Sequence, residues 1–207
     1  MGINGKIVEV KNLKKSELHE MYNIMDKHYD NMKFENFMED IEEKEHCIIL
    51  QEEDSLKIVG FSTQKVMKIE IEGEEFYGVF SGDTVIEKEH WGSMELYKIF
   101  ARFFIEYGKQ YGKFYWFLIS KWYKTYKMLP LFFNEFYPNY RAETPYNIKK
   151  IMDKFGETRY RNEYSSESGV INYNGKKDRV KAGIADITDR LMEDMDIEYF
   201  VKKILNI

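Results

Sequence analysis

The chain has 207 residues, of which 43% are apolar and 32% are charged. That apolar content is too high for a disordered chain, and the length suffices for one sizeable core. The formal net charge of −5 argues against non-specific nucleic-acid binding, which depends on a positive field. No apolar run approaches the roughly 20 residues that span a bilayer. We therefore expect one globular domain, 1–207, without a membrane span and in the cytoplasm.

The first half of the chain alternates between helical and strand periodicity. Residues 6–10 predict a short strand, and Ser16 is the expected N-cap of the helix that follows. Apolar residues at helical spacing predict a second helix over 34–43. The period then becomes two, which predicts strands over 46–51, 56–71 and 76–86, with a tight turn at Glu72-Gly73-Glu74 between the last two.

After Gly92 the helical period returns, and Gly108 and Gly112 are expected to end this helix. Residues 114–119 are almost wholly apolar, which is typical of a strand covered on both faces. A further helix from about Lys121 must be kinked or divided by Pro130. Beyond it we expect a helix over 148–155, a strand over 170–173 that ends at an Asn174-Gly175 turn, and a last helix over 189–204.

This order predicts an α+β fold, because hairpin strands followed by a strand-helix-strand crossover give a mixed sheet with helices on both faces. The sheet is expected to be mostly antiparallel. We place the core of the domain at about 6–140 and a C-terminal extension at about 141–207. Cys47, the only cysteine, falls in an apolar run and is expected to be a buried core thiol rather than a nucleophile.

The same order, with the segment Thr84-Val85-Ile86-Glu87-Lys88-Glu89-His90-Trp91-Gly92-Ser93-Met94-Glu95-Leu96, resembles the GNAT acyltransferase superfamily. In that family a turn at the start of this helix holds the pyrophosphate of coenzyme A on backbone N–H groups, where the helix dipole favours an anion. The resemblance implies a GNAT-like fold over roughly 6–140. It assigns carrier binding to a set of positions in this segment: Val85, Ile86, Trp91, Gly92, Ser93 and Met94.

The segment departs from the family pattern, because Gly92 is the only glycine of that pattern retained. Side chains at the other positions hinder close approach of a pyrophosphate. Two interpretations stay open. Either a coenzyme A thioester is bound in an altered manner, or the 4'-phosphopantetheine arm of an acyl carrier protein is used, as in the similar N-acyl amino acid synthases and acyl-homoserine-lactone synthases. The basic bias over 121–154 would suit an acidic carrier protein, or it is an ordinary solvated face.

The unit 114–136 resembles the family's fifth strand and the helix after it. In the family the two central strands splay apart and the pantetheine arm lies between them, and Gly82 could mark the bulge that accompanies such a splay. The family's catalytic tyrosine has no secure counterpart here, and Tyr126 and Tyr137 are the nearest phenols. Ser120 follows the buried strand, where it would meet the thiolate or cap the next helix.

Acyl transfer to an amine needs a base for the ammonium proton and a proton for the leaving thiolate. Asp83 and Glu87 are the candidate bases, since residues four apart on a strand share a face. Ser120 and Tyr126 complete the candidate catalytic set. For Asp83 a hydrogen-bonded structural role competes with the catalytic one, and for Glu87 a helix-dipole role does. His19 and His28 have no further ligand at metal spacing, and no metal is expected.

The leading hypothesis is an N-acyltransferase that transfers an acyl group from acyl-CoA or acyl-carrier protein to a small-molecule amine. The alternative is a catalytically degenerate GNAT-fold protein that binds a ligand or partner, which the loss of glycines favours.

Overall fold

The computed structural model describes residues 2–173, 179–181, 183–184 and 186–205. Its residues group into two compact units. The first unit comprises Met1–Lys68 and Tyr77–Ile119, and the second comprises Ile69–Phe76 and Ser120–Ile207. The boundary after Ile119 falls about twenty residues before the end of the predicted core, because residues 120–140 pack among themselves and with α8. That the whole chain acts as one domain stays a prediction.

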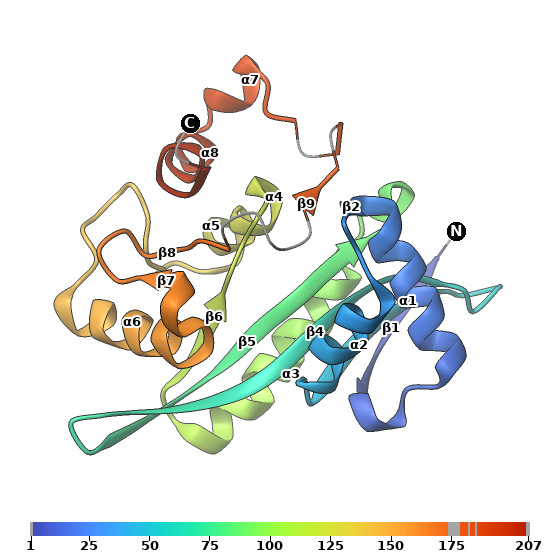
Figure 1. Ribbon diagram of the computed structural model, residues 1–207, viewed down its shortest axis with the longest axis horizontal. Helices are drawn as coiled ribbons and strands as arrows, with labels where there is room; N and C mark the ends of the chain where they lie inside the picture. Colours follow the sequence, from blue (N-terminus) through green and yellow to red (C-terminus); the bar gives the residue numbers. More distant parts are fainter. Residues whose placement is uncertain (1, 174–178, 182, 185, 206–207) are drawn as a thin grey trace. The chain divides into compact units, whose positions relative to one another are not determined.

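A five-stranded sheet carries the first unit. Its strands are β1 (Ile3–Glu9), β3 (His46–Glu52), β4 (Ile58–Ile71), β5 (Glu74–Ile86) and β6 (Phe114–Leu118), in the order β1-β3-β4-β5-β6 (Figure 1). The pairs β1–β3 and β3–β4 are antiparallel, and β5–β6 is parallel. Glu72 and Gly73 turn β4 into β5 with φ of 53° and 83°, the left-handed values that a two-residue hairpin requires. The predicted mixed, mostly antiparallel sheet is confirmed.

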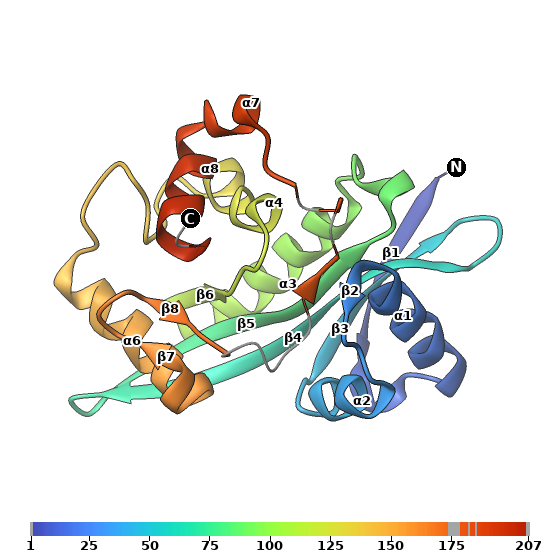
Figure 2. The same ribbon diagram turned by 45° about the horizontal axis from the view of Figure 1, so that its top comes forward.

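Helices cover both faces of this sheet (Figure 2). In chain order the other elements of the unit are η1 (Val10–Asn12), α1 (Lys15–His28), β2 (Tyr29–Asp30), α2 (Phe34–Glu42), η2 (Lys88–His90) and α3 (Glu95–Tyr111). On β3, Cys47 and Ile49 face the core under α1 and α2, and Ile48 and Leu50 face the core under α3. The continuous apolar run of β3 is therefore explained by burial on both faces.

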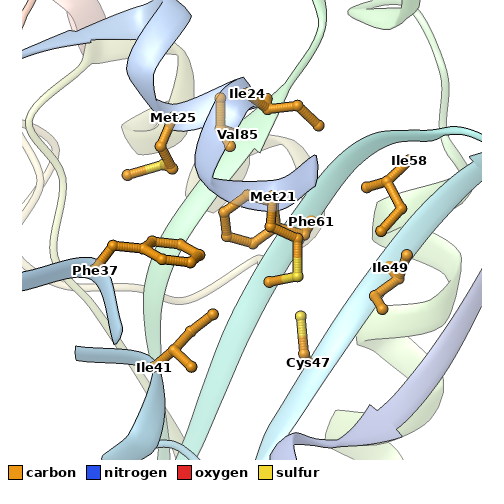
Figure 3. Close-up of a cluster of buried hydrophobic side chains, with 10 residues drawn as sticks. All are labelled: Met21, Ile24, Met25, Phe37, Ile41, Cys47, Ile49, Ile58, Phe61 and Val85. Atoms are coloured by element: carbon orange, nitrogen blue, oxygen red, sulfur yellow. The ribbon is translucent and has the colours of Figure 1, made fainter. Parts of the chain in front are cut away.

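The core under α1 and α2 combines two methionines with aromatic and branched side chains (Figure 3). Met21 and Met25 of α1 meet Phe37 and Ile41 of α2 over Phe61 of the sheet, and each has an exposed fraction of at most 1%. The opposite core is aromatic as well, with Phe100 and Trp116 ring centroids 4.5 Å apart. The predicted helical faces are thus confirmed.

Apart from the 15-residue helix α6, the second unit is built from short elements. Its elements are α4 (Tyr123–Tyr126), α5 (Met128–Phe132), α6 (Tyr146–Tyr160), η3 (Arg161–Glu163), β7 (Tyr164–Ser165), β8 (Val170–Ile171), β9 (Arg179–Val180), α7 (Asp189–Met192), α8 (Met195–Phe200) and η4 (Val201–Leu205). The strands β7 and β8 pair antiparallel. One of its cores joins the aromatic residues of 123–136 to Ile197 and Phe200 of α8.

Several expected boundaries were wrong, for local reasons. The N-cap of α1 is Lys14 and not Ser16, because the Lys14 N–H donates to the carboxylate of Glu17 at 2.9 Å. The helix expected after Gly92 begins at Glu95, after the 3-10 turn η2. It continues through Gly108 and ends at Gly112, whose φ of 73° suits a helix end.

In the second unit the helix expected from Lys121 is divided, as Pro130 required. Pro130 lies in the first turn of α5, where its missing N–H costs nothing. The single helix expected over 189–204 is replaced by α7, α8 and η4, because Asp194 caps a new helix start. The Asn174-Gly175 turn lies outside the described residues.

Among the described residues, no helix is both long enough and apolar enough to cross a membrane.

Candidate functional site

The parallel ladder between β5 and β6 is short. It runs from the pair Tyr77↔Phe114 to the pair Ser81↔Leu118, where β6 ends. Strand β5 continues to Ile86, so residues 82–86 extend past its last partner on β6 (Figure 1). Backbone N–H and C=O groups on that side of β5 are thereby released from the ladder with β6, the edge strand of the sheet.

The alternation of side chains along β5 breaks at the same place. Ser62 and Gln64 lie two apart on β4 and therefore point to one face of the sheet. Ser81 donates to Gln64 Oε1 (2.8 Å), and Thr84 Oγ1 lies 2.8 Å from Ser62 Oγ. Because Ser81 and Thr84 are three apart, a regular strand would aim them at opposite faces. Their common face indicates a bulge at 82–83, as predicted from Gly82.

Gly82 is required at this bulge by the groups beneath it. A Cβ on Gly82 would lie 2.5 Å from Thr63 Oγ1 and 2.7 Å from Lys44 Cε. Lys44 is itself fully buried, and its ammonium donates to the carbonyl and carboxylate of Asp40 at 2.8 and 2.7 Å. Any larger residue at position 82 would have to displace the Thr63 hydroxyl or the buried side chain of Lys44.

Asp83 lies within the bulge and is half-buried. Burial chiefly raises the pKa of the Cys47 thiol, and the negative charges of Glu17 and Asp83 add to that effect. The Asp83 carboxylate is therefore close to the core under α1 and α2 although it stands on the part of β5 beyond β6. An acidic group in this position can take a proton from a ligand that lies along β5.

Glu87 does not share the strand with Asp83, contrary to expectation. It follows the end of β5, and its N–H donates to the carbonyl of Val59 at 2.8 Å. Its carboxylate forms an ion pair with Lys27 of α1 and is only 13% exposed. The bulge and the strand end therefore separate two carboxylates that a regular strand would have placed on one face.

Residues of the turn before α3 are largely held by one another. The indole N–H of Trp91 donates to the carbonyl of Ile86 at 2.8 Å. The N–H of Ser93 donates to the carbonyl of His90 at 2.9 Å, and the Ser93 hydroxyl accepts from the N–H of Glu95 at 3.1 Å. The backbone N–H of Trp91 donates to the carbonyl of Lys88 at 3.3 Å, so two backbone donors of this turn, those of Trp91 and Ser93, have partners within the protein.

Other positions of this segment leave more room. A Cβ on Gly92 would meet nothing within 4 Å, and the Met94 side chain is 45% exposed. Val85 is 6% exposed within the core under α1 and α2, and Ile86 packs against the α3 core. For Val85 and Ile86, only the backbone is suited to contact a ligand beside the sheet.

The remaining two candidates, Ser120 and Tyr126, belong to the second unit. The Ser120 hydroxyl donates to the carbonyl of Trp122 at 2.6 Å and accepts from its N–H at 3.2 Å, which closes a turn before α4. Tyr126 is 5% exposed, and its hydroxyl donates to the carbonyl of Pro138 at 3.1 Å. Burial raises the pKa of Tyr126. Within one compact unit, the structure brings together only the candidates on 83–94.

A buried polar chain on the α3 side of the sheet was missed from the sequence. It passes through Trp116, Ser81, Gln64, Ser62 and Thr84. A signal was available, because Ser62-Thr63-Gln64 interrupts an otherwise apolar part of β4 and Ser81 and Thr84 do the same on β5. The alternation alone could not show that these side chains meet.

Most of the basic residues expected to attract an acidic partner are paired within the second unit. Lys127 contacts Asp194 and Asp196, and Arg141 also contacts Asp196. Lys149 and Lys150 form ion pairs with Asp153 and Glu72. These carboxylates offset the local positive charge that the sequence alone suggested.

The two histidines considered as ligands have structural contacts. His28 Nδ1 lies 2.8 Å from the carbonyl of Ile24, and the ring of His19 stacks on Phe34 at 4.8 Å. Over the described ranges, three or more His, Cys, Asp or Glu side chains are nowhere grouped as they would be to hold a metal ion.

Comparison with known proteins gave structural similarity without sequence similarity. No protein-family model matches the chain, and no curated protein does. A ribosomal-protein-alanine N-acetyltransferase from Brucella melitensis biovar Abortus 2308 is 7% identical, with a TM-score of 0.49 over 70% of this chain and 100% of that one. An aminoglycoside N-acetyltransferase in complex with CoA is 13% identical, with a TM-score of 0.49 over 70% and 97%.

A further match is a protein from Enterococcus faecalis V583 described as a probable N-acyltransferase. It is 12% identical, with a TM-score of 0.47 over 60% of this chain. The chain spans 31% of that protein's length. The three matched structures are thus described as N-acetyltransferases or as a probable N-acyltransferase.

Proposed function

We propose that the chain is a GNAT-type N-acyltransferase that transfers an acyl group from a thioester to an amine. One observation carries this proposal: β5 continues through a bulge past Ser81↔Leu118, the last pair of the parallel β5–β6 ladder. An extended chain with amide groups can add to a strand that continues past the end of its neighbour, as a further strand would. The pantetheine arm of an acyl carrier is a chain of this kind.

The residues at the end of β5 fit such a carrier in part. The open space at Gly92 would admit a phosphate close to the backbone, and the start of the 17-residue helix α3 favours an anion. Met94 is exposed on the same turn. In this proposal the backbone of Val85 and Ile86 holds the arm, and the turn at 91–94 holds the phosphate end.

The carrier would supply an acyl carbon activated as a thioester. The protein would supply a base for the ammonium proton of the amine, and we assign that role to Asp83. Glu87 is less suited, because its carboxylate is paired with Lys27. A role for Ser120 or Tyr126 in protonating the thiolate stays a prediction: both belong to the second unit, and the Tyr126 hydroxyl donates to the carbonyl of Pro138.

We favour acyl-CoA over acyl-carrier protein as the donor. The carrier-protein hypothesis depended on basic residues over 121–154, and four of these have carboxylate partners in their own unit. Attraction of an acidic protein needs positive charge that is not offset locally.

A second candidate is a GNAT-fold protein that binds a carrier or partner without turnover. It is favoured by the turn before α3, where the Trp91 indole and the Ser93 N–H have partners within the protein. A turn held in this way offers fewer donors to a pyrophosphate than a glycine-rich one would.

One experiment separates these candidates. The protein is incubated with acetyl-CoA, a long-chain acyl-CoA or an acyl-carrier protein and a broad panel of amines, and released thiol and thermal stability are followed. Thiol release that depends on the amine is the expected result. Thermal stabilisation by acyl-CoA without thiol release would support the binding protein. If none of the three donors gave thiol release or thermal stabilisation, both proposals would be overturned. Activity restricted to the carrier protein would reverse our choice of donor.

A further inference from the structure

A continuous chain of side-chain hydrogen bonds crosses the three strands around the proposed site. The indole N–H of Trp116 on β6 donates to Ser81 Oγ on β5 (2.8 Å), and Ser81 donates to Gln64 Oε1 on β4 (2.8 Å). Gln64 Nε2 donates to Ser62 Oγ (2.7 Å), which lies 2.8 Å from Thr84 Oγ1. Gln64, Ser62 and Ser81 are at most 3% exposed, whereas Thr84 is half-buried.

The direction of donation along this chain is fixed at its Trp116 end. An indole nitrogen only donates, so Ser81 Oγ accepts there and its own proton goes to Gln64. If the Gln64 amide were reversed, its NH2 group would face Ser81. Ser81 Oγ would then accept from both Trp116 and Gln64, and the Ser81 proton would lose Gln64 Oε1 as its acceptor. The orientation with Gln64 Nε2 toward Ser62 therefore gives the Ser81 proton an acceptor and directs an amide N–H to Ser62.

The same reasoning orients the last link. Ser62 Oγ accepts from Gln64, and among the described residues Thr84 is the only other side-chain partner of this buried hydroxyl. If Thr84 donated to Ser62, the Ser62 proton would be buried without an acceptor in the chain, which is costly. Ser62 therefore donates to Thr84, and the proton of the Thr84 hydroxyl is left to face outward.

Thr84 stands in the part of β5 that extends beyond β6, next to the bulge. Its hydroxyl is the terminal donor of a chain in which each bond polarises the next, and such a donor is strengthened toward an oxygen that carries negative charge. A side chain that only filled the sheet would not need this preorganisation.

We propose that the Thr84 hydroxyl is a hydrogen-bond donor to the acyl carbonyl oxygen of the thioester, where negative charge develops during transfer, and that Ser62, Gln64, Ser81 and Trp116 position it. This inference rests on the proposed function. It adds a catalytic hydroxyl that neither the sequence pattern nor the resemblance assigned.

The test compares Thr84→Val, which removes the hydroxyl at nearly constant shape, with Thr84→Ser, which keeps it. Thr63→Val is the matched control, because Thr63 is a buried threonine of the neighbouring strand whose hydroxyl has no hydrogen-bond partner among the described residues. Initial rates of thiol release are measured against acyl-CoA concentration, and urea unfolding checks that each variant is folded.

We expect Thr84→Val to lower kcat by at least about tenfold with KM within about twofold, since a donor used in the transition state affects kcat. Thr84→Ser should recover kcat to within about threefold of the wild-type protein, and Thr63→Val should match it. Ser62→Ala should lower kcat less, and adding it to Thr84→Val should have no further effect, because both act through one hydroxyl.

Two results would overturn the inference while leaving the proposed function intact, given that the wild-type protein releases thiol. These are an unchanged kcat in Thr84→Val, whether or not KM is raised, and an additive loss of kcat in the double variant. Absence of thiol release by the wild-type protein would instead overturn the proposed function, and this inference with it.

Discussion

The indole N–H of Trp116 donates to the hydroxyl of Ser81 at 2.8 Å, which joins β6 to β5 by a side-chain bond close to the end of their ladder. Immediately beyond Ser81 the alternation of β5 is broken by the bulge at 82–83. The Trp116–Ser81 bond ties the two strands together within their ladder, and the bulge follows directly after Ser81 on β5. Together they define the point at which β5 and β6 cease to pair.

Gly82→Ala should destabilise the protein, because the added methyl group would meet Thr63 Oγ1 and Lys44 Cε at less than 3 Å. We expect the free energy of unfolding to fall by about 1–3 kcal/mol, as for other overpacked cores, in urea unfolding. Gly108→Ala is the control. A Cβ at this position of α3 would lie 3.7 Å from Phe114 Cβ, an ordinary contact, so the change should raise the free energy of unfolding by up to about 1 kcal/mol. A stable Gly82→Ala protein would contradict the tight packing at the bulge.

Asp83→Asn should lower kcat by about a hundredfold with little change in KM for acyl-CoA, because the amide cannot accept the ammonium proton. Steady-state thiol release measures both constants. Glu87→Gln is the comparison, since its carboxylate is already paired with Lys27, and its effect on kcat should be much smaller. Equal activity of Asp83→Asn and the wild-type protein would remove Asp83 from the mechanism.

Gly92→Val should weaken binding of acyl-CoA by about tenfold or more, since a branched side chain at this turn keeps a pyrophosphate away from the backbone. Its effect on stability should be small, because the space beside Gly92 is open. Calorimetric titration of the variant and of Gly108→Ala, at the other end of α3, gives the comparison. Undiminished affinity would place the carrier elsewhere.

The Cys47 thiol should resist modification in the folded protein. Burial raises the pKa of Cys47, and only the thiolate reacts with thiol reagents. At pH 8 we expect less than about a tenth of one thiol per chain to react within an hour in buffer, and one thiol per chain in guanidinium, because the chain has a single cysteine. Rapid stoichiometric labelling of the folded protein would show that this core opens readily.

Asp194 should make the protein more sensitive to acid. Burial would raise the pKa of Asp194, but the Lys127 ammonium and the N–H groups of Asp196 and Ile197 together lower it. A lowered folded pKa means that the stabilisation is present above about pH 4, the unfolded value, and is lost as the pH falls through the folded value.

Asp194→Asn should therefore lower the free energy of unfolding by less than about 1 kcal/mol at pH 7, since the pair is partly exposed, and by less at pH 3. Urea unfolding at both pH values measures the difference. The exposed neighbour Glu193, changed to Gln, is the control and should be neutral. An effect of Asp194→Asn that is the same at both pH values would refute the ion-pair account.

The sequence by itself determined the first unit well. The change from helical to two-residue period at His46 and the turn at Glu72-Gly73 follow from local pattern, and both are confirmed. The apolar run 114–119 does contain the strand β6, but its residues are half-buried at the edge of the sheet and not covered on both faces as expected. Such patterns are strong where an element is long and one of its faces is buried. The second unit was predicted less well, because its helices other than α6 are short and their ends depend on single caps such as Asp194.

Only the tertiary structure decided how the candidate residues are arranged. The strand pattern placed Asp83 and Glu87 on one face, whereas the bulge and the end of β5 separate them, because a bulge shifts the side-chain alternation by one residue. The chain from Trp116 to Thr84 was also beyond the sequence, since its members come from three strands and meet only when the register of the sheet is fixed. Sequence patterns report which residues are buried along one element, and contacts between elements depend on the packing of the whole sheet.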